Sequence, residues 1–347
     1  MKKHWWKILG VILLVYSFLV GMLVPLKPGI VSASPANFKT GDRAQIMVEG
    51  YNTFYQKGEV HRAWLKLADD QQLAAQQIQV ISDTKMKIDF VLPVTLPGED
   101  KVMDATLILD NMIDGATVLP SAIFITRQEN DGGGTQWQNN LISDLHEKSG
   151  MTFPYRNILS ETIRSTYYHV PYWFAMMIIF VISMVYSIQY LSTNDPLKDH
   201  KAAAFTSVGV LYGVLGLVTG AIWAKFTWGS YWSFDIKQNM AAIAMLVYLA
   251  YFVLRASFED EEKKARISAV YNIFAFACLV PLLFVIPRLT DSLHPGNGGN
   301  PGFGGEDLDN TMRLVLYPAV IGWILVGTWM ANLLYRMESL KEKIYGF

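Results

Sequence analysis

The chain has 347 residues with 29 Lys and Arg against 30 Asp and Glu, and this formal net charge of −1 argues against a nucleic-acid partner. Hydrophobic residues make up 52% of the chain and charged residues only 17%, below the roughly 25% of a soluble domain. The single cysteine, Cys278, excludes an internal disulfide and a CxxC redox motif.

Six apolar segments are long enough to cross a bilayer, which takes about 20 residues. They cover approximately residues 5–26, 168–191, 203–223, 239–255, 268–288 and 313–335. The first segment follows the basic sequence MKKHWWK, as a signal sequence does. We expect it to be a retained anchor, because its core is long and no clear cleavage motif follows; a cleaved signal peptide is the alternative. The chain is thus predicted to be an α-helical integral membrane protein with six transmembrane helices.

Basic residues predict the orientation of these helices, because Lys and Arg concentrate in cytoplasmic loops. With both termini in the cytoplasm, the following residues all fall on the cytoplasmic side: Lys2, Lys3, Lys7, Lys198, Lys201, Arg255, Lys263, Lys264, Arg266, Arg336, Lys341 and Lys343. The outer side then receives residues 27–167, the segment 223–237 and the loop 289–312. Six spans satisfy this charge asymmetry and five do not.

Residues 27–127 have a different pattern, in which short alternating runs lie between clusters of turn residues. This spacing predicts an extracytoplasmic all-β, sandwich-like domain inserted after the first helix. His61 and Trp64 are expected to be solvated residues of one strand. The Gly-rich, polar stretch 128–154 is predicted to be a flexible linker in which His146 is exposed.

The remaining residues, 155–347, form the predicted five-helix membrane domain, with 1–26 as the transmembrane anchor. Its outer loop 223–237 reads WAKFTWGSYWSFDIK and is dense in aromatic rings. Interfacial aromatic residues often serve only as a membrane belt. The density here also suits a platform for a flat ligand, which would consist of Trp223, Trp228, Tyr231, Trp232, Phe234 and Asp235.

Two histidines are predicted at the same outer level as this loop. His169 opens the second span, and His294 follows the fifth. Imidazole is a common axial ligand of haem iron, aromatic rings suit a porphyrin, and cations can pair with its propionates. The candidate cations are Arg164, Lys225, Lys237 and Arg288. Other flat ligands such as quinones fit the composition too, and each of these residues alone has an ordinary interfacial interpretation.

The motif WGSYWSFD resembles the WGxxWxWD signature of the haem-handling CcmC/CcsA family of cytochrome c biogenesis, and most closely its haem exporter protein C branch. His169 stands in YHVP with Arg164 five residues before it, and His294 stands in DSLH, as in that branch. Two positions differ: Phe234 replaces the last Trp and loses its N–H donor, and Lys237 replaces an Arg found in some relatives. The resemblance covers residues 1–26 and about 155–340, whereas the insert 27–150 is not part of the usual family pattern.

The resemblance implies a non-enzymatic protein that binds haem b at the outer face of the bacterial cytoplasmic membrane, with His169 and His294 as axial ligands of the iron. It implies delivery of haem to a periplasmic haem chaperone, maturation protein E. A small membrane protein D, an ATP-driven transporter and membrane lipid are the other expected partners. Two alternatives remain open: a cytochrome c synthase that attaches haem itself, and a receptor or assembly scaffold that acts through the β domain.

Overall fold

The computed structural model describes residues 4–68, 71–97, 99–128, 136–139, 141–294 and 308–345. The chain divides into two compact units. One consists of Met1–Leu23 with Glu161–Phe347, and the other of Val24–Ser160. The Gly-rich part of the predicted outer loop, residues 295–307, lies outside the described residues, as do positions 129–135 and 140 of the predicted linker.

Within its described residues the first unit contains six long helices, and all six are long and apolar enough to cross a membrane, as the sequence predicted. They are α1 (Trp5–Leu23), α2 (Thr166–Thr193), α3 (Pro196–Trp228), α4 (Ile236–Ala256), α5 (Glu261–Val280) and α6 (Asn310–Tyr345). A short 3-10 helix, Ser160–Ser165, leads directly into α2. Beyond α5 the chain continues as a short π-helix, Pro281–Val285, and then as a short 3-10 helix, Ile286–Arg288. The regular α-helical hydrogen bonds are interrupted here because Pro281 and Pro287 have no backbone N–H to donate.

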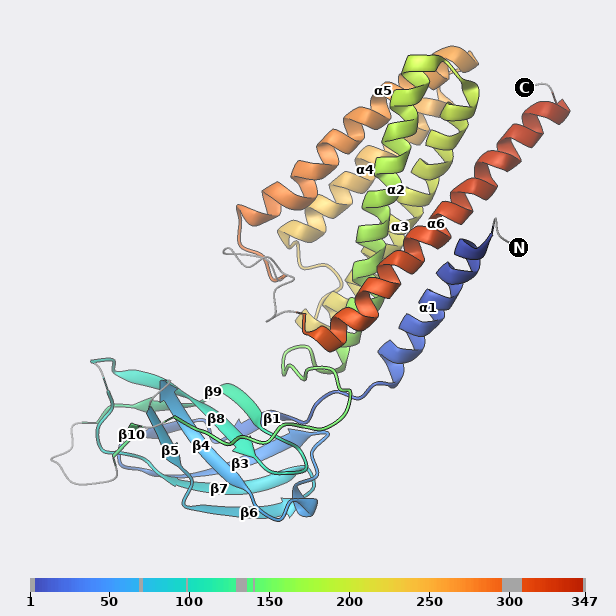
Figure 1. Ribbon diagram of the computed structural model, residues 1–347. Coiled ribbons are helices and arrows are strands. Elements are labelled where there is room, and N and C mark those ends of the chain that lie inside the picture. The colour runs from blue at the N-terminus through green and yellow to red at the C-terminus, as the bar shows by residue number, and fades with distance from the viewer. Residues whose placement is uncertain are drawn as a thin grey trace. The chain divides into compact units, whose positions relative to one another are not determined.

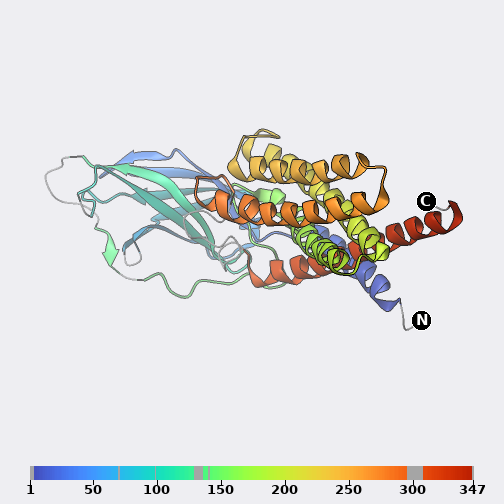
Figure 2. The same cartoon turned by 90° about the horizontal axis from the view of Figure 1, so that it is seen from above.

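Helices α2 to α6 share one hydrophobic core, and α1 lies beside α6 (Figures 1 and 2). Gly10 and Gly322 permit this close pairing, since a methyl group on Gly10 would meet Leu325 at 3.0 Å and one on Gly322 would meet Leu14 at 2.8 Å. Successive helices alternate in direction. The start of α2, the α3–α4 connection and the end of α5 therefore lie at one end of the unit (Figure 1).

The second unit is a β-sandwich, which agrees with the predicted all-β character of this region. One sheet has the strand order β1-β3-β7-β6 and the other β10-β5-β4-β8-β9-β2, with pairing that is antiparallel except between β2 and β9. The strands are β1 (Gly29–Ser34), β2 (Asn37–Lys39), β3 (Arg43–Tyr51), β4 (Arg62–Ala68), β5 (Gln71–Ala74), β6 (Gln77–Ser82), β7 (Lys85–Val91), β8 (Val102–Asp110), β9 (Thr117–Thr126) and β10 (Gln138–Asn139). Alternate residues of both sheets, such as Ile46, Leu65 and Leu107, are buried in the shared core.

The two ends of the sandwich unit lie next to each other. The backbone N–H of Lys27 donates to the carbonyl of Phe153 over 2.7 Å, and that of Phe153 donates to the carbonyl of Pro25 over 2.9 Å. Leu26 and Phe153 are both almost fully buried beside this bridge. The sandwich is thus an insertion whose first and last residues are held together by its own hydrogen bonds.

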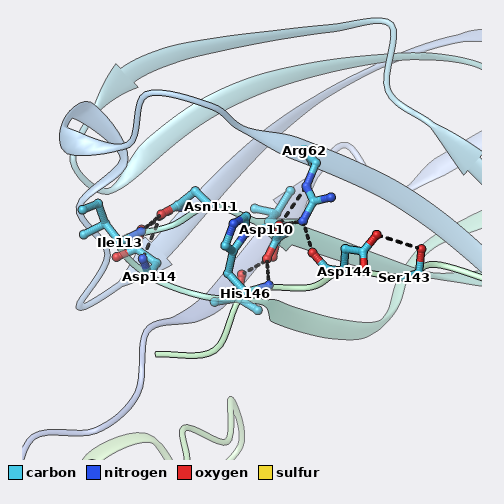
Figure 3. Close-up of polar contacts among 10 residues, drawn as sticks. Arg62, Asp110, Asn111, Ile113, Asp114, Ser143, Asp144 and His146 are labelled. Carbon is cyan, nitrogen blue, oxygen red and sulfur yellow. Dashed lines mark hydrogen bonds and ion pairs between the residues drawn. The ribbon is translucent and has the colours of Figure 1, made fainter. Parts of the chain in front are cut away.

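The segment that leaves the sandwich is attached to it, and His146, which was expected to be exposed, is partly exposed and hydrogen-bonded to Asp110. The Asp110 side chain accepts hydrogen bonds from the backbone N–H of His146 at 2.8 Å, from the ring of His146 at 2.8 Å, and from Arg62 (Figure 3). Arg62 also donates to the backbone carbonyl of Asp144. The described part of the predicted linker around His146 is therefore held in place, because a fully buried carboxylate requires these donors.

His61 and Trp64 also differ from the expectation of plain solvated strand residues. His61 precedes β4 and packs edge-on against the buried Tyr55 ring, with centroids 6.2 Å apart, and its Nε2 atom is buried. Trp64 lies under the Arg62 guanidinium, 5.3 Å from the ring centroid. The side chains of His61 and Trp64 thus pack against neighbouring residues. The Arg62 guanidinium covers the Trp64 ring and also bonds to Asp110.

We predict that Asp110→Asn destabilises the sandwich by about 3 kcal/mol, because it leaves Arg62 without its buried anionic partner. Thermal unfolding should show the loss, and limited proteolysis should cut faster near residue 146. Burial opposes ionisation of Asp110, but the His146 and Arg62 hydrogen bonds lower its pKa below the ordinary value. This stabilisation is therefore present at neutral pH and is lost as pH falls below about 4.

The matched control is Asp144→Asn in the same segment, whose exposed side chain bonds only to Ser143 at 3.4 Å among the contacts described. It should leave both readouts unchanged. Equal effects of the two substitutions would contradict the role assigned to Asp110.

Candidate functional site

The aromatic segment forms the last turn of α3 and a tight connection to α4. Helix α3 ends at Gly229, whose φ of 83° is left-handed and whose N–H donates to the carbonyl of Lys225 at 3.1 Å. The buried Gln238 side chain accepts the Ser233 N–H at 2.9 Å and so fixes the turn from the α4 side. Phe234 also has a left-handed φ of 56°, which is unfavourable for a bulky residue. The surrounding contacts thus hold this short connection in one strained conformation.

Asp235 joins two segments that are far apart in sequence. Its Oδ1 atom caps α4 by accepting the Lys237 N–H at 2.9 Å. The same carboxylate accepts the Ser292 hydroxyl at 3.1 Å, the Leu293 N–H at 2.7 Å and the His294 Nδ1 at 2.9 Å. The acidic residue that ends the aromatic motif therefore binds the segment after α5 to the start of α4.

The electrostatics of Asp235 favour a permanently ionised carboxylate. Burial opposes its charge, but the hydrogen bonds from His294, Leu293 and Ser292 outweigh burial and hold the Asp235 pKa well below its ordinary range. Because an ionised carboxylate can only accept hydrogen bonds, the His294 Nδ1 atom must carry the proton. The lone pair of His294 then lies on Nε2, which the carboxylate leaves available.

His294 also contacts the aromatic segment. Its ring lies edge-on to Trp228, with centroids 4.7 Å apart and an interplanar angle of 72°. The Ser292 hydroxyl accepts the backbone N–H of His294 at 3.1 Å, which fixes the backbone of this residue. His294 is thus oriented by Asp235 through its ring, by Ser292 through its backbone and by Trp228 through ring packing.

His169 is held in a similar way by α3. Its Nδ1 atom lies 3.1 Å from the Thr219 hydroxyl, and that hydroxyl donates to the Leu215 carbonyl at 2.7 Å. A hydroxyl that donates its one hydrogen to a carbonyl accepts at the remaining contact, so His169 Nδ1 is the donor and Nε2 keeps the lone pair. The ring is edge-on to Trp223 at 5.7 Å and to Trp173 at 6.2 Å.

Two glycines of α3 make room for these rings. A methyl group on Gly220 would approach the His169 ring to 2.7 Å, and one on Gly216 would approach Trp173 to 2.8 Å. Gly216 and Gly220 are one helical turn apart, as are His169 and Trp173 on the facing helix. The small-residue spacing in GLVTG was the sequence signal for this contact. The sequence analysis identified His169 but missed Thr219, Gly216 and Gly220.

The structure brings both histidines to the same end of the helical unit. They pack against Trp223 and Trp228, which belong to one helix and are about 7.5 Å apart along its axis at 1.5 Å per residue. A charge on His294 acts on His169, so the two rings are electrostatic neighbours. In the part of the chain that the structure describes, both imidazoles are bonded through Nδ1 and not through Nε2, and they lie beside the indoles of Trp223 and Trp228.

The other predicted platform residues are divided between supporting and exposed positions. Trp232 donates its indole N–H to Asn239 at 3.2 Å, and Trp223 donates to the Thr162 hydroxyl at 3.3 Å. Tyr231 and Phe234 have 59% and 79% of their surfaces exposed. Trp223 and Trp228 therefore line the histidines, Trp232 braces the turn, and Tyr231 and Phe234 form its outer surface.

The four predicted cations also differ in their surroundings. Arg164 bonds to Glu161 at 2.6 Å and to the Gly21 carbonyl at 2.8 Å, which links the 3-10 helix before α2 to the end of α1. Lys225 donates to the Gly229 carbonyl at 2.9 Å at the end of α3. Lys237 is half-buried near Asp235 and feels the charge of the exposed Arg288. Lys237 thus lies within electrostatic reach of both Asp235 and Arg288.

Comparison with known proteins gives a family match over the helical region. The family model described as "CcmC: Heme exporter protein C" matches residues 150–345. The heme exporter protein C of Bradyrhizobium diazoefficiens is 26% identical over 183 residues, which cover 53% of this chain and 69% of that protein. The protein of the same name from Haemophilus influenzae is 28% identical over 169 residues, or 48% of this chain and 65% of the relative.

A shorter similarity reaches a second group. The cytochrome c biogenesis protein CcsA of Synechococcus sp. (strain CC9605) is 40% identical over 87 residues, which cover 25% of this chain and 28% of that protein. The resemblance inferred from the aromatic motif and the two histidines is thereby confirmed. Because the family model matches more than half of its residues, the chain belongs to the heme exporter protein C (CcmC) family.

Proposed function

We propose that this protein binds haem b between His169 and His294 and hands it to a carrier during cytochrome c maturation. The observation that supports this most strongly is the matched state of the two imidazoles. Each has its Nδ1 atom hydrogen-bonded to an oxygen acceptor and its Nε2 atom available, which is the arrangement that iron ligation by histidine requires.

The surrounding residues fit a porphyrin. Trp223 and Trp228 supply broad apolar faces beside the two histidines. Among the four candidate cations we assign the propionates to Lys237 and Arg288, because Lys237 interacts electrostatically with Asp235, which binds His294, and with Arg288. Bound haem would supply the iron, and the chain would supply ligands, an apolar edge and counter-charges.

The two ligands differ in how firmly the fold holds them, and this suggests how haem leaves. His169 belongs to α2 and packs into a recess made by glycines of α3. His294 lies on the segment after α5, outside any of the six long helices, where Asp235, Ser292 and Trp228 contact it. We infer that His169 stays in place while His294 withdraws, so that an incoming carrier can supply the replacement ligand.

The proposed setting follows the family and the charge distribution. The haem site faces the outer side of the bacterial cytoplasmic membrane, with both termini and the Lys- and Arg-rich ends in the cytoplasm. The receiving partner is a periplasmic haem chaperone, maturation protein E, with membrane protein D, an ATP-driven transporter and membrane lipid as neighbours. The protein itself makes and breaks no covalent bond of haem. A haem-attaching synthase is the second candidate, because of the similarity to CcsA over 87 residues.

The first prediction concerns the two ligands. The purified protein should carry non-covalent haem b, and His169→Ala and His294→Ala should each lower haem content roughly tenfold or change its spectrum. Pyridine haemochrome assays measure the content, and absorption spectra measure the ligation. His200→Ala is the control, because His200 faces Glu342 at 3.8 Å near the start of α3. Wild-type content and spectrum in both ligand variants would refute the assignment.

The second prediction concerns Asp235. Asp235→Ala removes the acceptor of His294 and should weaken haem binding by about 10- to 100-fold, the usual cost of losing a residue that orients a metal ligand. Hydrogen exchange of the backbone around Leu293 should become faster in the same variant. The exposed neighbour Asp291 provides the control substitution Asp291→Ala. Unchanged exchange and unchanged haem affinity in Asp235→Ala would contradict the role of this carboxylate.

The third prediction separates haem binding from the sandwich. Because Lys27 and Phe153 are hydrogen-bonded to each other, residues 28–152 can be replaced by a short Gly-Ser linker across this contact. The shortened protein should keep its haem spectrum. Loss of haem from a protein that still inserts and folds would favour the scaffold alternative, in which the β unit carries the function.

A further inference from the structure

The outer face of the four-stranded sheet contains a polar hollow. Its volume is about 230 Å³, and it is lined by Gln45, Gln77, Gln79, Lys87 and Asp89. Lys87 and Asp89 form the floor, since they belong to β7, which lies between β3 and β6. The three glutamines belong to those flanking strands and line the hollow on either side of β7.

Strand register explains why these side chains meet. Gln45 of β3 and Gln77 of β6 both pair with Asp89, and Gln79 pairs with Lys87. Residues paired across neighbouring strands project from the same face of a sheet. The five side chains therefore form a two-row array over three strands, and the opposite face of β7 carries the core residues Ile88 and Phe90.

The carboxylate of Asp89 is fixed in this group of side chains by hydrogen bonds from its neighbours. Only 8% of the residue is exposed, and its carboxylate accepts from Gln45 at 3.1 Å and from Arg43 at 3.2 Å. A carboxylate held by two donors keeps further acceptor positions for a ligand. Asp89 can thus receive hydrogen bonds from hydroxyl groups but repels a simple anion.

The other polar groups of the hollow are the side chains of Gln77, Gln79 and Lys87. Within the described ranges, no side chain or backbone group bonds to the amides of Gln77 and Gln79 or to the ammonium of Lys87. Amides donate and accept equally, while the ammonium only donates and carries charge. The ligand that satisfies all of them offers several hydroxyl groups toward Asp89 and the amides and an anionic group toward Lys87.

We propose that this hollow binds one ring of an acidic saccharide, a sugar that carries a carboxylate. The volume of the hollow is below the 300–1,000 Å³ of common small-molecule pockets, so we expect its ligand to be no larger than a single sugar ring. The five lining side chains are all polar, and the exposed Met47, which pairs with Lys87 on the same face, is the apolar neighbour beside them. This polar lining favours a saccharide over lipids and aromatic ligands. The site lies outside the helical unit and does not depend on haem.

The experiment measures binding of glucuronate oligosaccharides to the full-length protein in nanodiscs by isothermal titration calorimetry. Neutral glucose oligosaccharides and inorganic phosphate are compared at the same concentrations. Glucuronate should bind, glucose should bind about tenfold more weakly through loss of the Lys87 contact, and phosphate should not compete.

Lys87→Ala and Gln79→Ala should each weaken glucuronate binding about tenfold. Lys85→Ala is the matched control, because Lys85 is on the same face of β7, pairs with Glu49 at 3.7 Å and lies outside the lining. Thermal unfolding verifies that each variant is folded, and the haem spectrum should be unchanged in all three. Absence of glucuronate binding, equal binding of glucose, or equal losses in Lys85→Ala and Lys87→Ala would each overturn the proposal.

Discussion

The hydrogen bonds that meet at Asp235 are the interaction on which the helical end of this protein depends. One carboxylate caps α4, fixes the segment after α5 and orients the His294 ring. Burial of a charge is costly unless several donors surround it, and here Ser292, Leu293 and His294 supply them. The same carboxylate thus caps one helix and orients the His294 ring, so a substitution of Asp235 removes both contacts.

A second constraint acts at His169, where two glycines of α3 leave space that a side chain would otherwise fill. Gly216 and Gly220 let α2 approach α3 closely enough for His169 and Trp173 to pack against its backbone. In a membrane, close approach of this kind depends on small residues, because lipid competes with apolar side chains as a packing partner. His169 is thus held within the packing of two helices, whereas His294 is held on a connecting segment by Asp235, Ser292 and Trp228; the proposed release of haem rests on this difference.

Much of this arrangement could be predicted from the sequence, for reasons that particular residues make clear. Long apolar runs determine helices strongly, so the six spans were predictable, and alternating runs predicted the sandwich. The partnership of Asp235 with His294 was not predictable, because 59 residues separate them and only the fold brings them together. Thr219 was missed for the same reason. The hydrogen bond of His146 was missed because a Gly-rich, polar neighbourhood gives no sign of a buried acceptor such as Asp110.

The central claim is that two imidazoles of this chain ligate one iron. Electron paramagnetic resonance of the purified ferric protein, with nitrogen hyperfine couplings resolved after ¹⁵N-histidine labelling, tests it most directly. The account predicts a low-spin iron coupled to two histidine nitrogens, with one coupling lost in each single-histidine variant. A high-spin iron, or a spectrum that keeps both histidine couplings when His169 or His294 is replaced, would contradict it.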